Sequence, residues 1–149
     1  MRVLLIEDEV HKRDEMIQCV REVYGAPPEM ADSVRSAVLK VMESDFDIVI
    51  LDMALPTFGE NSIDKMKGHD QAQGGIEVLR TLKLKAKSPK IIVVTQYPDF
   101  YIGPTKVKLK DVSSIIYEKY NQQVLAGVLY KYKSKSTLQR IMSILRSQL

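Results

Sequence analysis

Short, unbroken apolar runs alternate along this chain with stretches whose apolar residues recur at helical spacing. Three runs are strong, namely Val3–Ile6, Asp47–Met53 and Lys90–Thr95, and the last is rich in β-branched residues. Such runs are typical of strands that are buried on both faces of a sheet. Weaker candidates are Glu29–Ala31 and Val124–Tyr130. The pattern therefore predicts five strands.

A helix is predicted after each strand. Met16 and Val20 belong to the first apolar stripe, which Gly25 ends, and Ser33 is typical of the N-cap of the second helix. Strands that alternate with helices favour a parallel sheet, and right-handed crossovers place helices on both of its faces. We expect a doubly wound α/β fold with a five-stranded parallel sheet, built by residues 1–149 as a single domain.

Composition and charge exclude several classes of protein. The single cysteine, Cys19, cannot form an internal disulfide, and no Cys/His spacing predicts a zinc site. The apolar runs are too short to span a bilayer or to serve as a secretory signal, so we expect a cytoplasmic protein without membrane contacts. Residues 76–149 carry 14 Lys/Arg against 4 Asp/Glu. This basic half contains no aromatic-interleaved motif, so we expect no nucleic-acid binding.

Polar side chains gather where the predicted strands end. Glu7 and Asp8 follow the first strand, Asp52 lies at the end of the Asp47–Met53 strand, and Thr95 and Lys131 follow later strands. Ligands of open parallel sheets bind beyond the carboxyl ends of the strands. Carboxylates there predict a Mg²⁺ site, and a Lys with a Thr hydroxyl can donate to phosphoryl oxygens.

At these residues the sequence resembles the receiver domain of two-component response regulators. The matching pieces are VLLIEDE at 3–9, DIVILDMALP at 47–56, IIVVT at 91–95 and VLYK at 128–131. The resemblance covers nearly the whole chain and implies a flavodoxin-like fold. It also implies a signalling protein that catalyses only its own phosphorylation and dephosphorylation, and no enzyme acting on a metabolite.

The resemblance assigns a role to each residue of the group. Asp52 is implied to be the phosphoacceptor and Asp8 a direct Mg²⁺ ligand, while Glu7 holds the metal through water. The backbone carbonyl of Ala54 completes the protein ligands. Two further residues are implied to contact the phosphoryl oxygens, namely Thr95 and Lys131.

The resemblance also implies partners. The donor is expected to be a phosphohistidine on a histidine kinase or a histidine phosphotransfer protein. The chain ends after its last predicted helix, so we expect a stand-alone receiver that signals by binding an output protein or acts within a phosphorelay. The sequence identifies neither the cognate kinase nor the output protein.

Three positions depart from the pattern of the family. Gln96 stands where a small residue is usual, Val128 where an aromatic ring is frequent, and Tyr132 where proline is usual. We expect a trans bond before Tyr132, because a cis bond to a non-proline residue is costly. These departures keep open the alternative of a degenerate receiver that binds partners without phosphorylation. A nucleotide or flavin binder is disfavoured because no Gly-rich loop follows the first strand.

Some interpretations remain open from the sequence alone. Glu7 and Asp8 could simply cap the following helix. Two connections, Thr57–Gly75 and Tyr97–Lys110, are longer than the few residues usual in such folds. We expect both to lie beside the acidic group, where they could form a rim that selects a partner or could be surface insertions.

Overall fold

The computed structural model describes residues 1–54 and 74–149. Its strands are β1 (Val3–Ile6), β2 (Glu29–Ala31), β3 (Ile48–Leu51), β4 (Lys90–Thr95), β5 (Asp99–Ile102), β6 (Thr105–Lys108) and β7 (Val124–Leu129). Its α-helices are α1 (Val10–Tyr24), α2 (Val34–Glu43), α4 (Gly74–Leu84), α5 (Val112–Tyr120) and α6 (Lys135–Arg146). No helix among these residues is long and apolar enough to cross a membrane.

Five of the strands form one parallel sheet in the order β2-β1-β3-β4-β7. Ile6 at the end of β1 pairs with Leu51 at the end of β3. Leu51 in turn pairs with Val93 of β4. The carboxyl ends of these three central strands therefore lie at the same edge of the sheet. The predicted doubly wound fold is confirmed.

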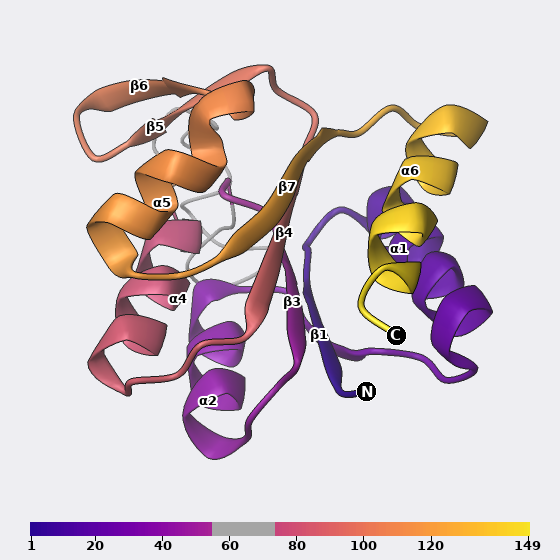
Figure 1. Ribbon diagram of the computed structural model, residues 1–149, viewed down its shortest axis with the longest axis horizontal. Helices are drawn as coiled ribbons and strands as arrows, with labels where there is room; N and C mark the ends of the chain where they lie inside the picture. Colours follow the sequence, from indigo (N-terminus) through magenta and orange to yellow (C-terminus); the bar gives the residue numbers. More distant parts are fainter. Residues whose placement is uncertain (55–73) are drawn as a thin grey trace.

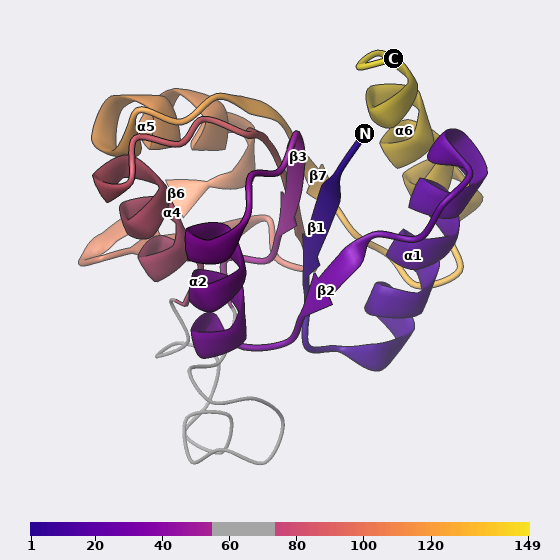
Figure 2. The same cartoon turned by 90° about the horizontal axis from the view of Figure 1, so that it is seen from below.

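The helices cover both faces of the sheet, with α1 and α6 on one side and α2, α4 and α5 on the other (Figures 1 and 2). Successive residues of a strand point to opposite faces. Leu5 of β1 accordingly packs with residues of α1 and α6, whereas Leu4 packs with residues of α2 and α4. Apolar side chains thus cover both faces of the sheet, so polar functional groups are expected at its carboxyl edge.

Local sequence explains where the first two helices begin and end. Gly25 adopts φ 77° as the C-cap of α1, a left-handed conformation that glycine adopts without steric cost. Ser33 caps α2, and its hydroxyl accepts a hydrogen bond from the N–H of Ser36. Both features agree with the sequence-based predictions.

The connection Tyr97–Lys110 contains two strands that the sequence-based prediction of five strands does not include. β5 and β6 pair as an antiparallel hairpin that turns at Gly103, which has φ 62°. The hairpin lies on the same side of the sheet as α5 (Figure 1). The Leu109 N–H donates to the carbonyl of Pro98 at 2.9 Å and closes the base of the hairpin.

The other long connection, Thr57–Gly75, lies mostly outside the described residues, so its proposed role stays a prediction. Its last residues already belong to α4, which begins at Gly74. The Gly75 N–H donates to the carbonyl of Met53 at 3.3 Å. A Cβ on Gly75 would lie only 2.8 Å from the Cα of Met53, so glycine permits this close approach.

Candidate functional site

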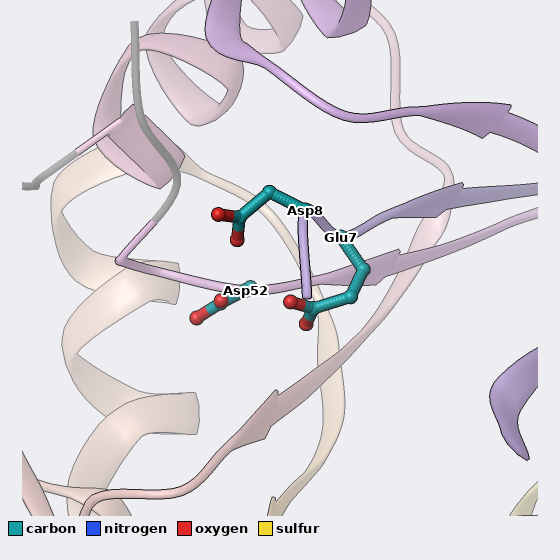
Figure 3. A group of neighbouring side chains, drawn as sticks. All are labelled: Glu7, Asp8 and Asp52. Atoms are coloured by element: carbon teal, nitrogen blue, oxygen red, sulfur yellow. The ribbon is translucent and has the colours of Figure 1, made fainter. Parts of the chain in front are cut away.

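Three carboxylates meet at the carboxyl edge of β1 and β3. Glu7 and Asp8 follow β1 directly, and Asp52 follows β3. The Asp52 N–H donates to the carbonyl of Ile6 at 3.2 Å, which extends the pairing of the two strands to this point. Each side chain offers an oxygen within 4.8 Å of the others, and Figure 3 shows Asp8, Asp52 and Glu7 clustered together. The convergence predicted from the strand ends is observed.

The three acids are largely withdrawn from water. Glu7 is 2% exposed, Asp52 4% and Asp8 9%. Burial, and then the nearby charge of Asp52, raise the pKa of Glu7 to about 8, while the Lys12 ammonium partly opposes this shift. Carboxylates held this close need a positive charge to offset their repulsion.

The capping interpretation of Glu7 and Asp8 does not hold, because Glu9 caps α1. The Glu9 carboxylate accepts hydrogen bonds from the N–H groups of His11 at 3.1 Å and Lys12 at 2.8 Å. The Glu9 N–H in turn donates to Glu7 Oε2 at 3.1 Å. Glu9 thus orients Glu7 toward the group of acids.

Lys12 enters the acidic group, and sequence reasoning missed it. Its side chain is 1% exposed, and its Nζ lies 2.6 Å from Glu7 Oε1 and 3.6 Å from Asp52 Oδ2. It also donates to Gln96 Oε1 at 3.1 Å. Burial alone would lower the pKa of Lys12, but the negative charges of Asp52 and Glu7 and the close contact with Glu7 outweigh it and raise that pKa. Lys12 therefore stays an ammonium.

A signal for Lys12 is present in the sequence. Lys12, Met16, Cys19 and Val20 are the buried residues of α1. Their spacing of i, i+4, i+7 and i+8 is that of one helical face. Lys12 lies one helical turn before Met16 on the same face of α1. Its side chain is therefore expected to lie between the helix and the sheet and not in solvent.

The other predicted residues differ in how they are placed. Thr95 ends β4 and is 2% exposed, and its hydroxyl accepts a hydrogen bond from the Tyr97 N–H at 3.2 Å. The Ala54 N–H donates to Asp52 Oδ1 at 3.0 Å, so the backbone after β3 wraps around the carboxylate. Both residues therefore lie at the sheet edge that carries the acids.

Lys131 is not brought into the group. Its side chain is exposed, and it forms no ion pair with the three carboxylates among the residues that the structure describes. The neighbouring Tyr130 is buried instead, and its hydroxyl donates to the Glu15 carboxylate. Val128 and Tyr130 pack with residues of α1 and α6, whereas Lys131 lies beyond the end of β7 and is exposed.

The acidic group fits a hard divalent cation. Mg²⁺ takes oxygen ligands at roughly 2.0–2.1 Å, so opposite ligands are about 4.2 Å apart. Glu7, Asp8 and Asp52 each offer an oxygen within 4.8 Å of the others, so at most a small contraction would match this spacing. With all groups ionised, three carboxylates and the Lys12 ammonium leave two negative charges, which one such cation would offset.

Comparisons with known proteins agree with this geometry, although no family model matches the sequence. The Detocs response regulatory protein DtcB of Vibrio alginolyticus is 29% identical over 153 residues, which cover 97% of this chain and 99% of that protein. The sensory transduction protein LytT of Bacillus cereus is 26% identical, over 93% of this chain and 50% of that protein.

Solved structures show the same fold. A response regulator from Colwellia psychrerythraea superposes with a TM-score of 0.63 at 15% identity, covering 99% of this chain and 98% of the other. The response regulator TrrA of Thermotoga maritima, in complex with Mg²⁺-BeF, superposes with a TM-score of 0.58 at 20% identity, covering 96% and 97%. The chain is homologous to response regulators and has the fold of their receiver domains. These relationships support a role in two-component signalling, and the acidic group supports Mg²⁺ binding.

The three departures from the family pattern can each be located in the structure. Val128 is buried in the apolar core, so this position carries an aliphatic side chain in place of a ring. The peptide bond before Tyr132 is trans, as expected, and the Tyr132 ring lies 5.0 Å from that of His11. The Gln96 amide oxygen holds Lys12. Of the three departures, Gln96 is the one that contacts a residue of the acidic group.

Proposed function

We propose that this receiver accepts a phosphoryl group on Asp52 in a Mg²⁺-dependent reaction. The observation that carries the proposal is the buried Asp52 carboxylate, which lies with Glu7 and Asp8 at the carboxyl edge of the sheet. The complex of TrrA with Mg²⁺-BeF supports it, because beryllofluoride resembles a phosphoryl group bound beside the metal. Asp47, at the opposite end of β3, accepts a hydrogen bond from the Arg2 N–H and is not a competing acceptor.

The transfer requires little covalent chemistry from the protein. A carboxylate oxygen of Asp52 attacks phosphorus, the P–O bond forms, and the P–N bond to the donor imidazole breaks. The departing imidazole takes up a proton. Positioning and charge neutralisation supply most of the catalysis in such reactions. The resulting acyl phosphate can be hydrolysed, which makes the modification reversible.

The surrounding residues would divide the work between metal and phosphoryl group. Asp8, Asp52 and the Ala54 carbonyl would ligate Mg²⁺ directly, and Glu7 would act through water. The metal would offset charge on the phosphoryl oxygens. The Thr95 hydroxyl would donate to a phosphoryl oxygen.

The expected donor is a phosphohistidine on a histidine kinase or a histidine phosphotransfer protein. Phosphorylated receiver would then bind an output protein or pass the phosphoryl group along a relay. The similarity to DtcB, which extends over 99% of that response regulatory protein, supports this signalling role. The alternative is a partner-binding module that never carries phosphate.

Incorporation from acetyl phosphate distinguishes the two functions. We expect mass spectrometry to show one added phosphoryl group on wild type in the presence of Mg²⁺ and none on Asp52→Asn. Asp45→Asn is the matched control, because the Asp45 side chain is 90% exposed and should incorporate as wild type does. Equal incorporation by Asp52→Asn would refute Asp52 as the acceptor. A lack of incorporation by wild type would favour the phosphate-free module.

A further inference from the structure

Lys12 is a buried charge that needs a reason. Lysine is almost never fully buried unless it is paired, because an ammonium loses its hydration. The Lys12 side chain continues the apolar face of α1, and its Nζ emerges beneath the acidic group. The Tyr130 ring lies 5.9 Å from that nitrogen and forms a wall behind it. The ammonium contacts Glu7 and Gln96 and faces Asp52.

The three contacts of the ammonium are unequal. An ammonium has three N–H donors. Glu7 Oε1 at 2.6 Å and Gln96 Oε1 at 3.1 Å are within hydrogen-bond distance, whereas Asp52 Oδ2 at 3.6 Å is not. The third donor therefore faces Asp52 across a gap. A phosphoryl group on Asp52 would extend that side chain and add oxygens, which could close the gap with a charge-assisted hydrogen bond.

No other lysine offers the same geometry among the residues that the structure describes. Among these residues, Lys12 is the lysine that lies beside Asp52, and Lys131 is exposed beyond the end of β7. Lys131 would have to reorient its exposed side chain to reach the group. A cation already in place needs no such rearrangement.

We propose that Lys12, and not Lys131, supplies the ammonium that pairs with the phosphoryl group on Asp52. Gln96 is a positioning residue that holds this ammonium from the opposite side. The inference rests on the proposed function, since it concerns the phosphorylated state of the same site. The family resemblance gives the phosphoryl contact to Lys131, at the end of the last strand, and the inference moves that contact to Lys12.

Binding of beryllofluoride in saturating Mg²⁺, measured by calorimetry and by fluorine NMR, tests the inference. Lys12→Met keeps the length and apolar stem of the side chain and removes its charge. We expect it to weaken beryllofluoride affinity at least about tenfold, the scale of one charge-assisted hydrogen bond. The matched control Lys131→Met should stay within about twofold of wild type. Mg²⁺ affinity should not fall in Lys12→Met, because an ammonium that opposes the cation is gone.

A second variant keeps the test informative if Lys12→Met does not fold. Gln96→Ala removes only an acceptor at the surface end of the contact, and we expect it to weaken beryllofluoride binding about two- to fivefold with Mg²⁺ affinity unchanged. In wild type, the Lys12 ammonium resonance in nitrogen NMR should shift when beryllofluoride is added, whereas that of Lys131 should not.

The outcomes separate this inference from the proposed function. Beryllofluoride affinity that is unchanged in both Lys12→Met and Gln96→Ala overturns the role of Lys12 and leaves Asp52 as acceptor. Loss of affinity in Lys131→Met with none in Lys12→Met returns the role to Lys131. A wild-type protein that neither binds beryllofluoride nor incorporates phosphoryl overturns the proposed function and this inference with it.

Discussion

Lys12 and Lys131 each follow a strand of the sheet at its carboxyl edge, after β1 and after β7. Lys12 is 1% exposed and pairs with Glu7, whereas Lys131 is exposed to solvent. The difference arises from the elements that carry them. Lys12 belongs to a helix face that packs on the sheet, while Lys131 lies in a loop after a strand whose buried face is taken by Tyr130. Position after a strand therefore does not decide which lysine enters the site.

Stability should reveal the contrast most strongly. In metal-free protein, Lys12→Ala removes the partner of two buried carboxylates. We expect the free energy of unfolding to fall by about 3 kcal/mol, the lower end for broken buried pairs, because Glu7 can take up a proton. Lys131→Ala should change it by less than about 0.5 kcal/mol, as for ordinary surface substitutions. Urea unfolding with a chelator present measures both, and equal losses would contradict the contrast.

Metal binding sharpens the comparison within the buried region. One carboxylate oxygen of Glu7 pairs with the Lys12 ammonium, and the other accepts a hydrogen bond from the Glu9 N–H. We therefore expect Asp8→Asn to weaken Mg²⁺ affinity about tenfold or more, which corresponds to about 1.4 kcal/mol, and Glu7→Gln to weaken it less. Calorimetric titration gives both constants. The reverse order would mean that Glu7 leaves Lys12 to ligate the metal directly.

The end of β7 supplies the smallest effect. Tyr130→Phe removes the hydroxyl that donates to Glu15, and we expect a loss of about 1 kcal/mol in the free energy of unfolding. Tyr132→Phe is the control, because Tyr132 is 53% exposed and should lose almost nothing. If both variants unfold at the same urea concentration as wild type, the Tyr130 contact does not anchor this strand end.

The sequence predicted the sheet and its acids because both depend on chain-local patterns. Apolar runs identify buried strands, and residues that follow parallel strands must share an edge, so Glu7, Asp8 and Asp52 could be placed together before the structure was known. Lys12 was missed because its burial depends on how α1 is rotated against the sheet. The apolar stripe through Met16 and Val20 indicates which face of α1 packs on the sheet. Lys12 lies on this face, but a charged residue is not expected in an apolar stripe.

Two other differences have similar causes. Lys131 was expected to point into the site because it follows an apolar strand, yet Tyr130 is the buried residue at this strand end and Lys131 is exposed. The β5–β6 hairpin was missed because Pro98, Gly103 and Pro104 obscure two short alternating segments. Pairing between segments is a property of the folded chain that single-strand periodicity does not reveal.

The close approach of Gly75 to Met53 has a consequence for how this chain can be altered. The backbone hydrogen bond between them joins the chain shortly before residue 55 to the chain shortly after residue 73. When the two ends of a segment already meet, doubling its length costs only about 0.6 kcal/mol in closure entropy. For the same reason, a fluorescent reporter inserted between these ends would lie next to Asp52 and could signal the occupancy of the site.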